Sequence, residues 1–138
     1  MRHSILRSTA LLVFGAFTQA QTVNSPQVNA ELLRHYQALV RIDTTDPPGN
    51  ETKAVEYIQQ VLETEGIPVI VTAKDPARAN LIARLKGNGS KRPILLLGHT
   101  DTVKVDPSKW SFPPFSATRD GGYVYGRGTL DNLSLIHI

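Results

Sequence analysis

The sequence predicts an α/β fold, because two segments with helical periodicity come before several strand-like segments. Apolar residues recur at helical spacing from Ala30 to Val40 and again from Glu51 to Glu65. Segments rich in apolar or β-branched residues follow at residues 69–73, 80–85 and 93–98. The last of them, "PILLLG", is continuously apolar, which is typical of a strand covered on both faces of a sheet. This order of helices and strands favours an α/β sheet.

Turn-forming residues separate the expected elements. The stretch "RIDTTDPPGNE" contains two prolines and Gly49, which exclude regular structure there, and Asn50 can cap the helix that follows. Gly66 stands where a glycine is expected, just past the end of that helix. Further along, "TRDGGYVYGRG" predicts a hairpin with its turn at residues 120–122 and a returning strand at residues 123–125.

The first twenty residues have the layout of a secretory signal peptide. Arg2 and Arg7 supply a basic start, and "ALLVFGAF" supplies an apolar run that is too short to span a bilayer. Thr18 and Ala20 provide small residues before a cut at Gln21. A buried N-terminal helix is the alternative interpretation, and the ordered succession of the three features favours the signal peptide.

The chain is therefore expected to contain three parts. Residues 1–20 form the signal peptide, residues 21–29 a flexible segment, and residues 30–138 one small domain or part of a larger domain. A signal peptide implies a secreted or periplasmic protein. Because the chain has no cysteine, disulfides, a thiolate nucleophile and cysteine zinc ligands are excluded.

The charge of the chain offers no support for a nucleic-acid partner. The formal net charge of +3 falls to +1 without residues 1–20, since Lys plus Arg decreases from 15 to 13 while all 12 acidic residues remain. The sequence contains no basic cluster of the kind that binds nucleic acid or an acidic membrane surface. We expect neither partner once the signal peptide has been removed.

Two titratable residues directly follow the apolar segment 93–98. His99 and Asp101 stand two positions apart, so their side chains point to one face if strand geometry persists. Ligand-binding groups gather at the carboxyl ends of strands in open α/β sheets, and a carboxylate often orients a metal-bound histidine. Asp131 follows the second predicted strand and a glycine-rich turn, where a carboxylate can bind one cation or bridge two.

Each of these residues also has a simpler interpretation. A His–x–Asp pair is more often a structural or surface pair than a metal site, and Asp131 alone is most simply a turn residue or a helix cap. We assign Asp43 and Asp46 to the structural class, and we expect His35 to lie on a helix surface.

The order of the segments resembles a known family. "LLLGHTDTV", a loop with "W" and "PPF", and then "DGGYVYGRGTLD" resemble the zinc-dependent exopeptidases and deacylases that include aminoacylase, glutamate carboxypeptidase, acetylornithine deacetylase and succinyl-diaminopimelate desuccinylase. "DPPGNE" also fits, and the resemblance covers roughly residues 30–132. It implies the N-terminal part of a zinc-exopeptidase-like catalytic domain, with an incomplete mixed sheet flanked by helices.

The resemblance also implies roles for the three candidate residues. His99 would bind zinc, Asp101 would be the catalytic carboxylate that orients this histidine, and Asp131 would bridge the two zinc ions of the complete enzyme. The implied reaction is hydrolysis of the amide bond in a peptide or N-acyl amino acid substrate, and a homodimer is compatible with the family.

The resemblance further implies that the site is incomplete in this chain. The glutamate general base, the other carboxylate ligands and a late histidine are expected beyond residue 138, so we expect the chain alone to be inactive. After "GTLD" the sequence departs from the family pattern, which favours a truncated gene fragment over a naturally short homologue. The alternative function is a non-catalytic exported binding domain that retains the peptidase fold.

The signal-peptide interpretation predicts cleavage after Ala20 during export, because the small residues at positions 18 and 20 suit a signal peptidase. N-terminal sequencing of the exported protein should therefore start at Gln21. Exported material that still begins at Met1 would contradict the interpretation.

Overall fold

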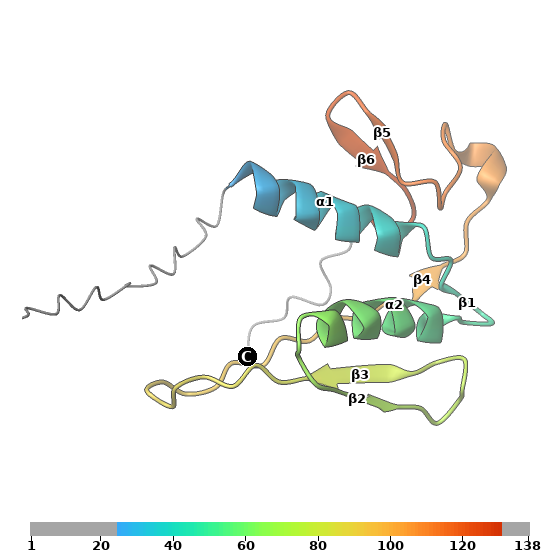
Figure 1. Cartoon of the computed structure of the whole chain (residues 1–138). Coiled ribbons are helices and arrows are strands. Elements are labelled where there is room, and N and C mark those ends of the chain that lie inside the picture. Colours follow the sequence, from blue (N-terminus) through green and yellow to red (C-terminus); the bar gives the residue numbers. More distant parts are fainter. Residues whose placement is uncertain (1–24, 131–138) are drawn as a thin grey trace, which may run out of the picture.

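The computed structural model describes residues 25–130, and it shows the expected combination of helices and short sheets. The predicted signal peptide and Asp131 lie outside the described residues. The elements, drawn in Figure 1, are α1 (Pro26–Val40), β1 (Thr45–Asp46), α2 (Glu51–Thr64), β2 (Val69–Thr72), β3 (Asn80–Ala83), β4 (Thr102–Val103), the 3₁₀-helix η1 (Pro107–Lys109), β5 (Thr118–Asp120) and β6 (Tyr123–Tyr125). Within residues 25–130, neither helix is long and apolar enough to cross a membrane.

Helix α1 begins earlier than the periodicity of its apolar residues predicted. Ser25 caps the helix, its Oγ accepting a hydrogen bond of 3.1 Å from the backbone N–H of Val28. Pro26 occupies the first turn, where a missing N–H costs no helical hydrogen bond. Residues 26–29, which were expected to be irregular, are therefore helical, because a Ser–Pro start does not require apolar residues in the first turn.

Helix α2 and the β2–β3 hairpin pack against each other as one unit. The two strands are antiparallel, with Val69 opposite Ala83 and Thr72 opposite Asn80. Helix α2 lies across this hairpin in Figure 1 and contacts both strands. The bounds of α2 and of both strands agree with the sequence prediction to within one or two residues. Among the described residues the buried apolar side chains are few and mostly small: Val40, Ala54, Val55, Ala79 and Ala117.

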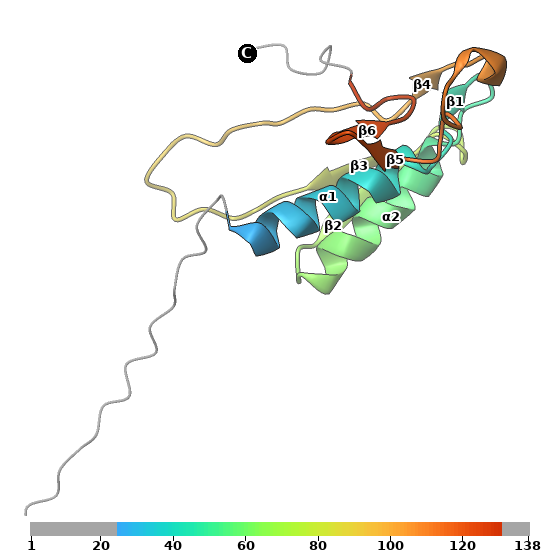
Figure 2. The same ribbon diagram turned by 90° about the horizontal axis from the view of Figure 1, so that it is seen from above.

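The prediction of a buried strand at residues 93–98 is wrong for this structure. The segment has no strand assignment, and its apolar side chains lie in solvent, with Ile94 84% and Leu96 81% exposed. Figure 2 shows the segment within a long loop that extends away from the helices. A central strand needs hydrogen-bonded neighbours and covering layers, and none of the described residues supplies them to this segment.

The β5–β6 hairpin forms as predicted and docks on α1. Asp120 pairs with Tyr123, and both loop glycines have positive φ (55° and 87°), as in a type I′ turn. Gln37 on α1 donates a 2.9 Å hydrogen bond to the carbonyl of Ala117, which precedes β5. After β6 the chain passes so close to α1 that a Cβ on Gly126 would overlap Val40. The approach of hairpin and helix therefore requires glycine at position 126.

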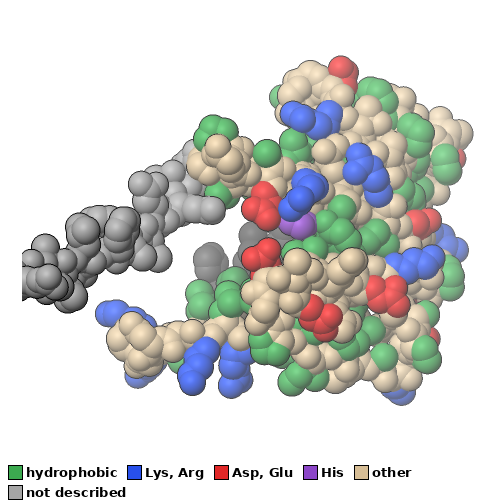
Figure 3. Space-filling model, viewed as in Figure 1, with side chains coloured by type: hydrophobic (Ala, Val, Ile, Leu, Met, Phe, Trp, Pro, Cys, Tyr) green, Lys and Arg blue, Asp and Glu red, His purple; other side chains and the backbone are tan. Residues whose placement is uncertain are grey.

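His35 lies on the surface of α1 as expected, but it is half-buried on the side that contacts α2. Its side chain is only 27% exposed, and its Nδ1 lies 2.7 Å from the hydroxyl oxygen of Tyr57 on α2. The contact joins the two helices, whose neighbouring surface carries interspersed basic and acidic side chains in Figure 3. Helical periodicity could not reveal this role because the partner residue belongs to a different helix.

The contact between His35 and Tyr57 predicts a stability difference between two tyrosine variants. Tyr57→Phe removes the hydroxyl that bonds the imidazole and should lower the free energy of unfolding by about 1 kcal/mol. Tyr123→Phe is the matched control, since Tyr123 is exposed on the hairpin. Urea unfolding of both variants measures the difference, and equal stabilities would show that the interhelical hydrogen bond contributes nothing.

Candidate metal centre

The short strand β4 is held beside β1 by parallel pairing. Thr45 is opposite Thr102 and Asp46 is opposite Val103. The N–H of Thr102 donates a 3.1 Å hydrogen bond to the carbonyl oxygen of Thr44. This pairing places the residues just before β4, which include His99 and Asp101, next to the loop that connects α1 with α2.

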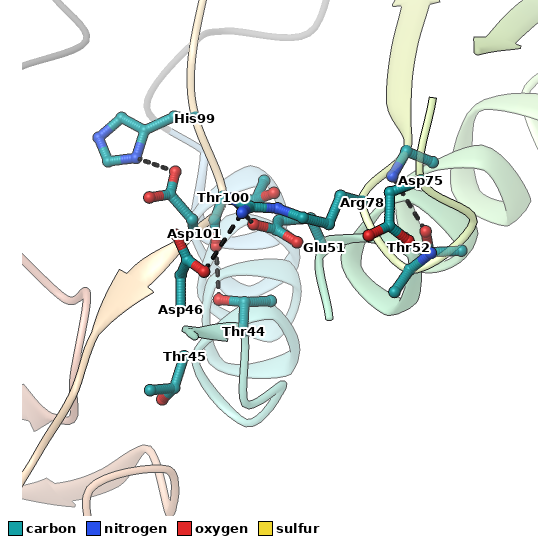
Figure 4. A network of polar contacts seen from close by, with 12 residues as sticks. Thr44, Thr45, Asp46, Glu51, Thr52, Asp75, Arg78, His99, Thr100 and Asp101 are labelled. Atoms are coloured by element: carbon teal, nitrogen blue, oxygen red, sulfur yellow. Dashed lines mark hydrogen bonds and ion pairs between the residues drawn. The ribbon is translucent and has the colours of Figure 1, made fainter. Parts of the chain in front are cut away.

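His99 and Asp101 contact each other directly. His99 Nδ1 and Asp101 Oδ1 lie 3.0 Å apart, and the two side chains are 40% and 44% exposed. Figure 4 shows the imidazole and the carboxylate together, with Thr100 directed toward the opposite side. The spacing of two residues thus brings both groups to one face, as the sequence suggested. A histidine that shares Nδ1 with a carboxylate is suited to coordinate a metal through Nε2.

A cavity of about 440 Å³ opens beside this pair. His99 and Asp101 contribute polar groups to its wall, while Tyr36, Val40 and Arg127 come from α1 and from the segment after β6. Clefts with largely apolar walls and a few convergent polar groups are the usual form of small-molecule sites. The cavity gives the histidine–carboxylate pair a space in which a small ligand could be bound.

A cluster of charged residues lies at the other end of β1. Arg78 contacts Asp46 through Nη1 at 3.2 Å and Glu51 through Nη2 at 2.8 Å. The hydrogen bond with Glu51, more than the charge of Asp46, raises the pKa of Arg78 above its ordinary value. Figure 4 shows the guanidinium between the two carboxylates. Asp46 is therefore a structural residue, as expected from the sequence.

The sequence did not reveal Arg78 or Thr44 as residues near the site. In the sequence, strand β2 and nearly all of helix α2 lie between Arg78 and its two carboxylate partners, Asp46 and Glu51. Thr44 bonds its side chain to the carbonyl oxygen of Thr100 at 2.5 Å, far along the chain. Only the stretch "DPPGNE" gave a signal, and it marked an irregular loop rather than these contacts.

The described residues provide only part of a metal site. Among residues 25–130, no three histidine, cysteine, aspartate or glutamate side chains come together in a way that could hold a metal ion. Catalytic zinc normally takes three protein ligands and a water molecule. The pair formed by His99 and Asp101 thus fits one ligand and the carboxylate that orients it, and other ligands would have to come from residues outside this range.

The α/β arrangement and the histidine–carboxylate pair beside a cavity are features of metal-dependent hydrolases. Residues 95–137 match the profile of peptidase family M20/M25/M40. This match includes His99, Asp101 and Asp131. The resemblance recognised from the order of the sequence segments is thereby confirmed.

Several curated relatives resemble most of the chain. An N-formyl-4-amino-5-aminomethyl-2-methylpyrimidine deformylase from Halalkalibacterium halodurans is 40% identical over 105 residues, which cover 73% of this chain and 25% of the relative. An acetylornithine deacetylase from Vibrio atlanticus is 36% identical, covering 72% and 27%. A probable succinyl-diaminopimelate desuccinylase from Staphylococcus epidermidis is also 36% identical, covering 80% and 26%. The matched part of the chain spans about a quarter of the length of these relatives.

The charged cluster predicts an unequal effect of two alanine substitutions. Gly49 and Gly89 both have positive φ (82° and 79°), so alanine should cost roughly 1 kcal/mol at either position from backbone strain. At Gly49 the new Cβ would lie 2.8 Å from Glu51 Oε2 and 3.1 Å from Arg78 Nε, whereas at Gly89 it meets no atom within 4 Å.

Gly49→Ala should therefore lower the free energy of unfolding by about 1–3 kcal/mol more than Gly89→Ala, the usual cost of overpacking. Urea unfolding of the two variants provides the comparison. Equal losses of stability would mean that the cluster can move aside without cost.

Proposed function

We propose that the protein is a metal-dependent hydrolase of amide bonds and that His99 and Asp101 belong to its metal site. The observation that carries the proposal is the 3.0 Å contact between His99 Nδ1 and Asp101 Oδ1 beside a cavity. The match of residues 95–137 to peptidase family M20/M25/M40 supports the same class of reaction. Because the chain spans about a quarter of its relatives, the activity is proposed for the full-length protein.

In this proposal His99 and Asp101 have different roles. His99 binds zinc through Nε2, while Asp101 accepts a hydrogen bond from Nδ1–H and so fixes both the tautomer and the orientation of the ring. Asp131, which lies outside the described residues, is proposed to bridge two zinc ions. Bound zinc would polarise the scissile carbonyl and lower the pKa of a water molecule.

The proposed substrates are peptides or N-acyl amino acids. The names of the acetylornithine deacetylase and the succinyl-diaminopimelate desuccinylase favour the second class, since both describe the removal of an acyl group from an amino acid. The cavity of about 440 Å³ has a size within the usual range for small-molecule sites. We also propose that the protein acts outside the cytoplasm, because residues 1–20 have the layout of a signal peptide.

The proposal predicts a graded loss of zinc in variants of the full-length protein. His99→Ala removes a direct ligand and should empty or cripple one zinc position. Asp101→Asn keeps the shape of the side chain but weakens the orientation of the ring, and should reduce zinc affinity or turnover by roughly 10–100-fold. Asp120→Asn is the matched control, since Asp120 is exposed at the tip of the hairpin. The zinc stoichiometry of the three variants and their turnover of N-acyl amino acids are the measurements that check this prediction.

The same measurements decide against the proposal if His99→Ala keeps its zinc and normal turnover. A full-length protein that binds a small ligand but neither zinc nor an amide substrate would instead support the non-catalytic binding domain. The 138-residue chain alone should bind zinc weakly and hydrolyse nothing, because three ligands do not converge within its described residues.

A further inference from the structure

The segment from His99 to Asp101 is held mainly from one side. Toward the N-terminus it follows the exposed residues 93–98, which have no strand partner among the described residues. Toward the C-terminus it continues into β4, whose strand partner in the described structure is β1. The position of the histidine–carboxylate pair therefore depends on how firmly β1 holds this segment.

Thr44 makes two hydrogen bonds to the backbone on either side of Asp101. Its hydroxyl donates to the carbonyl oxygen of Thr100 at 2.5 Å, and its own carbonyl oxygen accepts from the N–H of Thr102 at 3.1 Å. These bonds lie immediately before and after Asp101. Thr44 is only 3% exposed, so water does not readily replace its hydroxyl. The backbone of Asp101 is thus held on both sides by a single buried residue.

The segment that carries Thr44 is in turn fixed by Arg78. The guanidinium binds Asp46, the second residue of β1, and Glu51, the first residue of α2. Glu51 is 7% exposed, and a charge buried to this degree needs a charged partner nearby. Between them, the N–H of Gly49 donates to the carbonyl oxygen of Thr45 at 2.9 Å. A continuous series of contacts therefore leads from Arg78 through β1 to Thr44.

We propose that Thr44 is a positioning residue for the His99–Asp101 pair, with Arg78 supporting it from behind. The inference rests on the proposed function, in which this pair belongs to the metal site. Thr44, which also lines the cavity, acts by fixing the backbone from which His99 and Asp101 project. Without the hydroxyl of Thr44, the carbonyl of Thr100 loses this hydrogen bond. The backbone next to it is then less restrained, so the carboxylate of Asp101 can move away from His99 Nδ1.

The tautomer of His99 provides a readout that a general loss of stability would not change. When Asp101 accepts a hydrogen bond from Nδ1–H, the neutral ring carries its proton on Nδ1. Long-range ¹H–¹⁵N NMR of the 138-residue chain, at a pH where the ring is neutral, measures the fraction of this tautomer. The experiment requires no metal, so its outcome is independent of whether the full-length protein binds zinc or hydrolyses amides.

Three threonine variants test the role of the hydroxyl. Thr44→Val keeps the shape and removes the donor, and should at least halve the fraction of the Nδ1–H tautomer of His99. Thr44→Ser restores the hydroxyl and should recover the wild-type fraction. Thr45→Val, at the neighbouring position in β1, is the control and should leave the fraction unchanged. A Thr44→Val chain that is folded and keeps the wild-type tautomer overturns the proposal.

Two further measurements keep the proposal testable if Thr44→Val does not fold. In the wild-type chain, the amide hydrogen of Thr102 should exchange about tenfold more slowly than that of Leu96 in the exposed segment 93–98, because the Thr102 amide is bonded to Thr44. Arg78→Gln should shift the tautomer in the same direction as Thr44→Val, while Arg119→Gln, in the exposed strand β5, should not. Equal exchange at the two amides, or an unchanged tautomer in Arg78→Gln, overturns the proposal.

Discussion

The parallel contact between β1 and β4 is the constraint on which the candidate site depends. It consists of two residues on each strand, extended by the backbone and side-chain hydrogen bonds of Thr44. A ladder this short has little stability by itself. Its position is secured because Thr44 is buried and because Arg78 links the end of β1 to the start of α2. These contacts determine the position of His99 and Asp101.

A second set of contacts encloses the same region from the side of α1. The hydroxyl of Tyr36 donates to the carbonyl oxygen of Thr129 at 2.5 Å, and Gly126 allows the chain to pass against Val40. The guanidinium of Arg127 lies over the ring of Trp110, with its central carbon 5.2 Å from the ring centre. These contacts bring the segment after β6 to the wall of the cavity that also contains His99. The cavity therefore depends on packing between parts of the chain that are distant in sequence.

Local sequence signals were enough to predict the elements that local interactions stabilise. The glycine pair of the β5–β6 hairpin and the periodicity of α2 are signals within each element's own residues, and they predicted both elements. The spacing of His99 and Asp101 likewise placed both side chains on one face. Residues 93–98 were predicted wrongly because an apolar segment becomes a strand only where neighbouring strands can pair with it.

The residues that support the site could not be predicted from the sequence, for a related reason. The contacts of Thr44 with Thr100, of Arg78 with Glu51 and of His35 with Tyr57 join different elements, and no short pattern marks their partners. The periodicity of α1 placed His35 on the surface since it describes one helix in isolation. Family resemblance identified the groups that would carry the chemistry, whereas the structure was needed to find the residues that hold them.

The location of bound zinc tests the central claim most directly. A crystal structure of the full-length protein grown with zinc, with the metal identified by anomalous scattering, would locate the ion. The account predicts zinc about 2.0–2.1 Å from His99 Nε2, the usual zinc–imidazole distance, with Asp101 still bonded to Nδ1. Zinc bound elsewhere with no nitrogen of His99 among its ligands, or Asp101 turned away from the ring, would contradict the account.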